Sequence, residues 1–198
     1  MRTLSYRVLQ ARPRRSGTIG FVADQLVLVN GLPGSGKTTL AVALANDLGA
    51  CLLSKDQIKE ALAAILAAHT PTSLGAVTME TIWALARDID GIAIIDSFWC
   101  RPRDIEFARD GIARSRAGNV VEVWCEVPAN TARTRYSSRI RDPVHDDARR
   151  LASDWATWAQ LAEPLAISSV IQVDTTTRGS IARVAGRVRE QFAEGRQP

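Results

Sequence analysis

The residues best suited to chemistry form one short loop. Its fixed positions, Gly31, Gly36, Lys37 and Thr38, satisfy the spacing G-x-x-x-x-G-K-[ST]. In such a loop the glycines let backbone N–H groups turn toward an anion, the lysine neutralises the β- and γ-phosphates, and the threonine hydroxyl ligates Mg²⁺. We therefore predict a site for a nucleoside triphosphate with Mg²⁺. The expected contacts are Gly31, Leu32, Pro33, Gly34, Ser35, Gly36, Lys37, Thr38 and Thr39.

Two aspartates, each directly after or close behind a short apolar run, are the next candidates. Asp56 could accept the proton of an attacking hydroxyl, or it could cap the helix that follows. Asp96 could hold Mg²⁺ together with Thr38, bind an acceptor, or be satisfied by the N–H groups of a loop. Phe98 and Trp99 follow Asp96 and could form an apolar wall for an acceptor or cover the core.

The elements that must position these residues alternate between strand and helix. Short apolar runs predict five strands, at 26–29, 51–53, 92–95, 120–124 and 170–173. The segments between and after them predict helices at 38–48, 56–69, 74–88, 103–117, 130–136, 149–161 and 181–192, with Gly118 closing the fourth. This alternation favours an α/β fold with a five-stranded parallel sheet flanked by helices. Because the carboxyl ends of parallel strands open onto one crevice, Asp56 and Asp96 should face the phosphate loop.

Three segments together resemble a known group of proteins. They are 31–39, 53–59, and Asp96 with the nearby Arg101 and Arg103. They look like the small predicted P-loop kinases, an AAA-type group related to polynucleotide kinase, zeta toxins and chloramphenicol phosphotransferase. The similarity runs over about residues 25–177. It implies a P-loop NTPase fold with a helical substrate insertion and an Arg-rich lid.

The resemblance also implies roles for individual residues. Asp56 matches the general base, and Lys59 matches a basic residue that contacts the acceptor, where the family often has arginine. An ammonium recognises anions with less direction than a guanidinium, which argues against nucleic acid as the acceptor. Thr175 lies in a segment that resembles the loop near the adenine, and Arg103 joins the predicted substrate site.

The family carries an R-x-x-x-R pattern at the start of a mobile lid, which Arg135 and Arg139 match. The resemblance implies that these guanidiniums bridge the donor phosphates and stabilise charge on the transferring group. A lid over residues 137–147 would keep water from the γ-phosphate. Taken without the resemblance, the same arginines fit an exposed basic helix face paired with nearby aspartates.

Composition bounds the remaining possibilities. A chain of 198 residues with 46% hydrophobic and 23% charged residues is typical of one globular domain, which we place at 21–198 after a basic leader at 1–20. No apolar run approaches the roughly 20 residues that span a bilayer. The three cysteines lack CxxC spacing and suit a reducing cytosol, so we expect a cytoplasmic protein without membrane contact. The net charge of +4 suits a nucleotide site and does not demand nucleic acid.

The sequence therefore predicts an ATP- and Mg²⁺-dependent kinase. Lys37, Asp56, Arg135 and Arg139 are its expected catalytic residues, and the acceptor is a hydroxyl of a sugar, a nucleoside or an antibiotic-like molecule. The Ala- and Leu-rich helices at 56–88 favour an uncharged or partly apolar acceptor. Two alternatives stay open, a polynucleotide 5′-hydroxyl kinase and a nucleotide-binding regulatory protein without catalysis.

Overall fold

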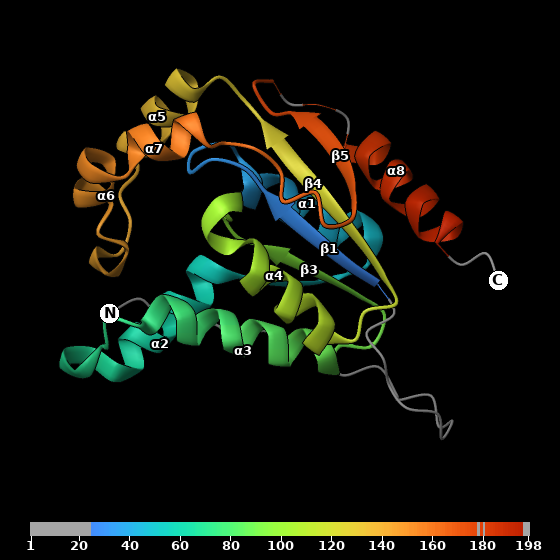
Figure 1. Ribbon diagram of the computed structural model, residues 1–198, viewed down its shortest axis with the longest axis horizontal. Helices are drawn as coiled ribbons and strands as arrows, with labels where there is room; N and C mark the ends of the chain where they lie inside the picture. Colours follow the sequence, from blue (N-terminus) through green and yellow to red (C-terminus); the bar gives the residue numbers. More distant parts are fainter. Residues whose placement is uncertain (1–24, 178, 180, 196–198) are drawn as a thin grey trace.

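In the computed structural model, five parallel strands form one sheet in the order β2-β3-β1-β4-β5 (Figure 1). The structure describes residues 25–177, 179 and 181–195, and the basic leader at 1–20 lies outside them. The strands are β1 (Gln25–Asn30), β2 (Cys51–Ser54), β3 (Ile92–Asp96), β4 (Asn119–Glu126) and β5 (Ser169–Asp174). Every residue of β1 is buried, as expected for the central strand of a sheet that is covered on both faces. The prediction of a five-stranded parallel α/β fold is confirmed.

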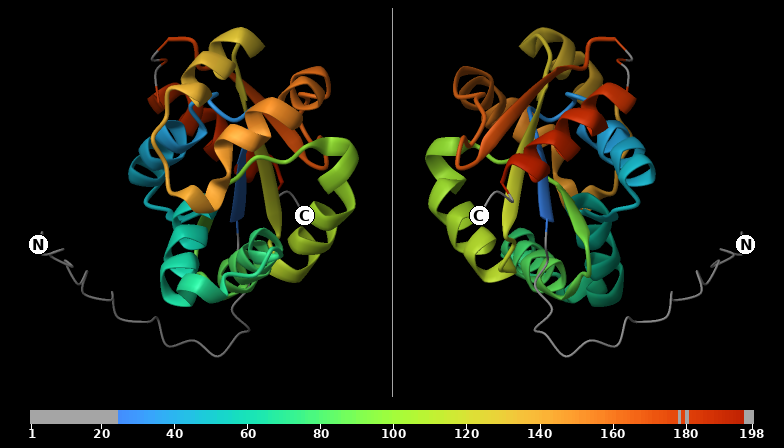
Figure 2. Two further views of the ribbon diagram at one scale, coloured as in Figure 1. Left: turned by 90° about the vertical axis from the view of Figure 1, so that its left-hand side faces the viewer. Right: turned by 90° about the vertical axis from the view of Figure 1, so that its right-hand side faces the viewer.

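Two helical layers cover the sheet, which Figure 2 shows edge-on between them. On one face, α1 (Lys37–Leu48) and α8 (Ile181–Glu194) pack against the strands through a cluster that includes Leu44 and Val188. On the other face, α3 (Leu74–Asp88) and α4 (Arg101–Ser115) contribute Trp83 and Ala108 to a second cluster. The helix α2 (Lys55–Leu66) lies beside α3 and adds Ile58 to the same cluster.

The remaining helices gather near the carboxyl ends of the strands (Figure 1). They are α5 (Ala129–Ser137), α6 (Asp147–Ser153) and α7 (Trp155–Gln160), with the 3₁₀ turn η2 (Pro143–His145) between α5 and α6. Leu32 of the phosphate loop packs with Tyr136 and Trp155 in a third apolar cluster. These helices therefore rest directly on the predicted phosphate site.

Three predicted helix boundaries were wrong. The helix expected at 149–161 is two helices, α6 and α7, which meet at Asp154. The helix α2 ends at Leu66 and is followed by the 3₁₀ turn η1 (Ala67–His69). The helix α4 ends at Ser115, before the predicted stop at Gly118, and Arg116 adopts a left-handed conformation there (φ 57°). In the described part of the chain, no helix combines the length and apolar character that a bilayer crossing requires.

Candidate active site

The phosphate loop turns sharply between β1 and α1, and this turn depends on glycine. Gly34 has a φ of 86°, a left-handed conformation that other residues rarely adopt. A Cβ atom built on Gly34 would lie 2.1 Å from the backbone oxygen of Ala132 in α5. The loop can therefore approach α5 this closely only with glycine at this position.

The loop leaves a set of hydrogen-bond donors suited to an anion. The N-cap of α1 is Gly36, and no side chain caps the helix, so its first N–H groups lack a side-chain acceptor. The Lys37 Nζ donates to the carbonyl oxygens of Gly31 and Leu32, at 2.9 Å each. Burial lowers the pKa of Lys37, although Asp96 opposes that shift. A bound phosphate would supply the negative charge that this buried ammonium lacks.

Asp96 lies at the end of β3, where the sheet register brings it beside β1 and β2. It is paired with Val29 on one side and with Ser54 on the other. The Thr38 hydroxyl donates to the Asp96 Oδ2 at 2.7 Å, and the Ser54 hydroxyl does so at 3.4 Å. Burial raises the pKa of Asp96, while Lys37 and the Thr38 hydrogen bond oppose the shift.

The fit of Mg²⁺ follows from this donor set. The described residues contain no group of three or more His, Cys, Asp or Glu side chains that could hold a metal alone. Mg²⁺ commonly binds through one or two protein oxygens, several waters and the phosphates of its substrate. The adjacent oxygens of Thr38 and Asp96 fit that mode of binding, in which the nucleotide completes the ligand set.

Asp56 lines the same cavity as Lys37, Thr38 and Asp96. It is in the first turn of α2, and its carboxylate pairs with the Arg141 guanidinium. His145 Nδ1 lies 3.7 Å from the second carboxylate oxygen. Asp56 therefore faces the phosphate loop as the order of the strands predicted, but two side chains of the lid hold it.

The lid is itself cross-linked by a partly buried polar network. The Arg141 Nε donates to Asp147 Oδ2 at 2.7 Å, and the Tyr136 hydroxyl donates to Asp147 Oδ1 at the same distance. His145, which is 5% exposed, shares a hydrogen bond of 2.7 Å between its Nε2 and the Glu60 carboxylate of α2. Residues 137–147 are thus joined to α5 and α6 at their ends and to α2 across the cavity.

The two arginines of the R-x-x-x-R pattern lie in different places. Arg139 lines the cavity. Arg135 is not among the lining residues, and its guanidinium donates to the carbonyl oxygens of Thr175 and Thr176, at 3.1 Å each. Thr175 lies beside the phosphate loop, since a Cβ built on Gly36 would be 3.8 Å from the Cβ of Thr175. Arg135 therefore holds the segment after β5 against the loop in this conformation.

The predicted acceptor residues also divide. Lys59, Phe98 and Arg103 line the cavity, but Trp99 does not. Trp99 is 2% exposed and packs in the cluster between the sheet and α4. It is therefore a core residue, and the prediction that it forms a wall of the acceptor site was wrong. The ring that accompanies Phe98 in the cavity is Trp158, at 5.3 Å between centroids in an edge-to-face arrangement.

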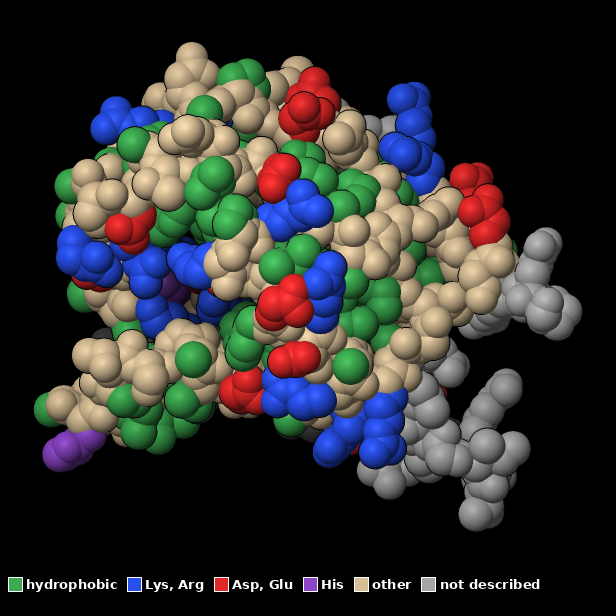
Figure 3. Space-filling view, in the orientation of Figure 1, with side chains coloured by type: hydrophobic (Ala, Val, Ile, Leu, Met, Phe, Trp, Pro, Cys, Tyr) green, Lys and Arg blue, Asp and Glu red, His purple; other side chains and the backbone are tan. Residues whose placement is uncertain are grey.

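Sequence reasoning missed several residues of the site. Arg141 and His145 contact Asp56, and Lys55 and Arg150 line the cavity as well. Arg141 was visible only as one more residue of a basic stretch, and its role depends on how the lid folds. Figure 3 shows Lys and Arg side chains gathered around a hollow between the lid helices and α2 and α3. The hollow, including its open mouth, measures about 850 Å³.

The sheet order, the phosphate loop between β1 and α1, and the lid over the strand ends define a protein of the P-loop kinase fold. Residues 26–165 match the AAA_33 family, an AAA domain. The chain therefore belongs to the AAA_33 family, and the resemblance to the small P-loop kinases is confirmed. No curated protein sequence matched the chain.

Three solved structures illustrate the shared fold. A protein from Chloroflexus aurantiacus, named provisionally as a kinase, is 23% identical with a TM-score of 0.67, and the alignment covers 85% of this chain and 98% of that one. Shikimate kinase from Acinetobacter baumannii is 14% identical with a TM-score of 0.52, covering 87% and 95%. The APS kinase of Mycobacterium tuberculosis, in complex with AMPPNP and APS, is 18% identical with a TM-score of 0.53, covering 86% and 98%.

Proposed function

We propose that this protein is an ATP- and Mg²⁺-dependent kinase that transfers the γ-phosphoryl group to a hydroxyl of a small molecule. The observation that carries the proposal is that the phosphate loop and Asp56 line one cavity. The names of the structural relatives support it, since shikimate kinase and APS kinase act on small molecules and the latter was solved with an ATP analogue. The membership of the family supports the same nucleotide chemistry.

In this proposal the donor is held at the phosphate loop. The N–H groups at the start of α1 and the Lys37 ammonium bind the phosphates. Thr38 and Asp96 would hold Mg²⁺, which would supply positive charge to offset the charge that develops on the phosphates. Thr175 lies beside the loop and marks where the nucleoside would lie.

Asp56 accepts the proton of the attacking hydroxyl. It can do so only when Arg141 exchanges the carboxylate for another anion, and the γ-phosphate is the natural candidate. The transition state of phosphoryl transfer is loose, so the base needs correct placement more than strong basicity. Arg139, which already lines the cavity, then stabilises charge on the transferred group; Arg135 would join it only if it released the segment after β5.

An ATP-consumption screen with mass detection of the product tests the proposal. The acceptors should include sugars, sugar acids, nucleosides, antibiotics and a 5′-hydroxyl oligonucleotide. We expect ADP to form together with a product heavier by one phosphoryl group. ADP formed only from hydrolysis, or nucleotide binding with no product in any arm, would instead favour a regulatory nucleotide binder. A product on the oligonucleotide alone would favour the polynucleotide kinase.

A further inference from the structure

The cavity holds more positive charge than its nucleotide requires. Seven Lys or Arg side chains line it, against two carboxylates. Three of the seven belong to the phosphate loop or the lid, namely Lys37, Arg139 and Arg141. The charge of Arg141 is already met by Asp56 and Asp147. Four cations remain that the donor site does not account for.

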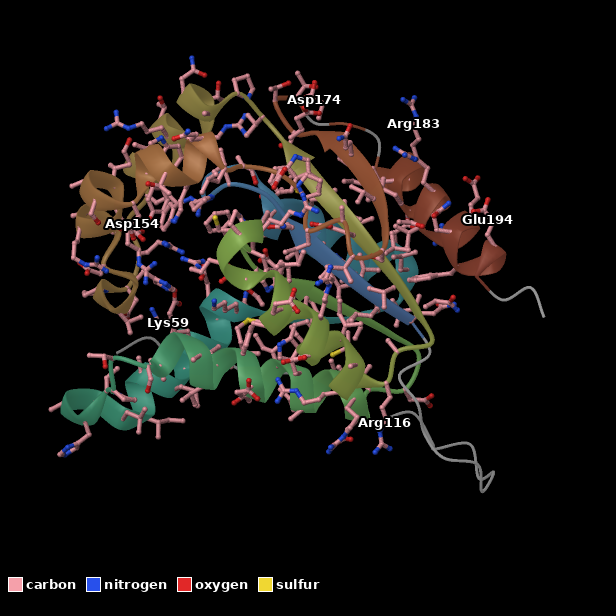
Figure 4. The ribbon with its side chains drawn as sticks, viewed as in Figure 1. Lys59, Arg116, Asp154, Asp174, Arg183 and Glu194 are labelled. Carbon is pink, nitrogen blue, oxygen red and sulfur yellow. The ribbon has the colours of Figure 1, made fainter. Side chains whose placement is uncertain are left out.

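These four cations, which we call the acceptor-side cluster, come from three helices. Lys55 and Lys59 lie on α2, Arg103 on the first turn of α4, and Arg150 on α6. Figure 4 shows Lys59 at the side of the gap where α2 faces the lid. Lys55 and Lys59 are one helical turn apart, and the fold brings Arg103 and Arg150 to them from distant parts of the sequence.

Most of the cluster has no carboxylate partner. Among the described residues, Lys55 makes no hydrogen bond or ion pair; the carboxylate that acts on it most strongly, Asp104, is itself paired with Arg103. The Lys59 Nζ donates to the Val144 carbonyl at 2.8 Å, and the Arg150 Nε donates to the His145 carbonyl at 3.0 Å. A carbonyl satisfies a donor but leaves its charge in place. Only Arg103 is paired, with Asp104.

This arrangement is costly without an anion. Burial lowers the pKa of both lysines, and it stays lowered although Asp104 opposes the shift at Lys55 and Asp56 opposes it at Lys59. The two carboxylates of the cavity do not form ion pairs with these lysines, because Asp56 is paired with Arg141 and Asp96 accepts from Thr38, although Asp56 offsets part of the shift in both lysines. A bound nucleotide would lie at the phosphate loop with Lys37 and the lid arginines, whereas the cluster comes from α2, α4 and α6.

Lysine itself is concentrated here. The chain has 25 Lys and Arg residues, and only Lys37, Lys55 and Lys59 are lysines. All three line this cavity. Lysine is a compact point charge with rotatable donors, whereas the planar fork of arginine binds carboxylate and phosphate in fixed geometry. The cluster combines both kinds of anion donor within one enclosed wall.

We propose that the acceptor-side cluster is a second anion site and that the acceptor is a small alcohol with its own phosphate or carboxylate group. This inference rests on the proposed kinase function and replaces the uncharged acceptor that the Ala- and Leu-rich helices suggested. The anion is held by Lys55, Lys59 and Arg150, with Arg103 able to leave Asp104 for it. Phe98 and Trp158 contact the carbon skeleton, and the hydroxyl points toward Asp56.

A small acceptor fits the enclosure better than a polynucleotide. The contacts from Lys59 to Val144 and from Arg150 to His145 tie the cluster to the lid. His145 further joins the lid to α2 through Glu60. These contacts narrow the cavity beside the cluster, whereas a continuing nucleic acid strand needs an open path along its backbone.

Protection of the three lysines from acetylation by added anions tests the anion site on the wild-type protein. Brief acetylation followed by mass spectrometry reports each lysine separately, because the chain has only three. We expect Mg·AMPPNP to protect Lys37 and to leave Lys55 reactive. Added inorganic phosphate, or malonate in a separate arm, should then lower the labelling of Lys55 about tenfold at ten times its dissociation constant. Unchanged labelling of Lys55 with both anions would overturn the inference.

Kinetics with matched acceptors gives the second test. The acceptors are a polyol, the corresponding sugar acid and the corresponding sugar phosphate. We expect one of the anionic members to be preferred, and Lys55→Met to raise its KM about tenfold or more without changing the KM for ATP. Arg87→Met, on the exposed side of α3, is the control that should change neither value. The preferred member distinguishes carboxylate from phosphate recognition.

The outcomes separate the two proposals. Equal kcat/KM for the neutral polyol and its anionic relatives would sink this inference and leave the kinase standing. Preference for a 5′-hydroxyl oligonucleotide would also sink it, in favour of nucleic acid as the acceptor. Failure of Mg·AMPPNP to protect Lys37, with no product from any acceptor, would instead sink the proposed function itself.

Discussion

Glu122 is a carboxylate in the middle of the sheet, 1% exposed, and it orders the base of the phosphate loop. It accepts hydrogen bonds of 2.9 Å from the Asn30 side chain and from the N–H groups of Leu165 and Ala166. The Asn30 Oδ1 in turn accepts from the Gly31 N–H at 2.7 Å and from the Trp99 N–H at 3.0 Å. One buried carboxylate therefore ties β4 to the first residue of the phosphate loop.

Replacement of Glu122 by glutamine should destabilise the protein. The amide keeps one oxygen, but its NH₂ group faces the N–H of Leu165 or of Ala166, which then lacks an acceptor, at a cost of about 1–3 kcal/mol. We expect the free energy of unfolding of Glu122→Gln, measured in urea, to fall by about 2 kcal/mol. Glu126→Gln, on the same strand but exposed, is the matched control and should change it by less than about 0.5 kcal/mol. Equal effects of the two substitutions would contradict this role of Glu122.

Among single residues, the sequence predicted those whose position follows from the phosphate-loop motif or from the end of a strand. Lys37, Thr38 and Asp56 line one cavity, because the spacing and the strand ends fix their positions. Arg141 and Glu122 were missed, since each acts through residues more than 80 positions away in the chain. Trp99 was placed in the acceptor site because the sequence after β3 does not show which of the two adjacent rings, Phe98 or Trp99, packs in the core.

The lid is the element whose state controls access to the site. Asp147 joins it to α5 by accepting from Arg141 and from Tyr136. Although burial acts to raise the pKa of Asp147, these hydrogen bonds hold it below its usual value. A carboxyl whose pKa is lower in the folded state contributes stability above its unfolded pKa of about 3.9, and this contribution is lost as the pH falls through the folded pKa.

Asp147→Asn should therefore lower stability in a pH-dependent way. We expect the free energy of unfolding to fall by about 2 kcal/mol at pH 7, since a hydrogen-bonded charge is lost. The difference from the wild type should shrink below about pH 4, where the wild-type carboxyl also loses its charge. Urea unfolding at several pH values measures this, with the exposed Asp110→Asn as the control. A difference that is independent of pH would rule out the charge of Asp147 as its cause.

The contact between α3 and α4 depends on Gly111. A Cβ built there would lie 2.0 Å from Cε2 of Trp83, which is 1% exposed. Gly111→Ala should lower the free energy of unfolding by about 1–3 kcal/mol through overpacking. Gly186 in α8 has open space around its Cβ position, so Gly186→Ala should raise stability by up to about 1 kcal/mol through helix propensity. Thermal unfolding distinguishes the two, and the same sign for both would contradict the packing described.

For the whole molecule, the alternation of apolar runs and helices was enough to predict the architecture. The five strands and the parallel sheet are as expected, because short apolar runs mark the strands, β1 is buried along its whole length, and each crossover contains a helix. The sequence did not predict that the helix at 149–161 would divide at Asp154, or that the cavity would be cationic. No local pattern encodes the cationic cavity, because its Lys and Arg side chains come from the phosphate loop, α2, α4, α6 and the lid.

The central claim is that one cavity holds the triphosphate and presents the Asp56 carboxylate to an acceptor hydroxyl. The most direct measurement compares Mg·ATP binding and product formation for the wild type and Asp56→Asn. We predict that the variant binds Mg·ATP with little change, while the rate of transfer falls by about 10²–10⁴-fold. Transfer at the wild-type rate by a variant that binds the nucleotide normally would contradict the account.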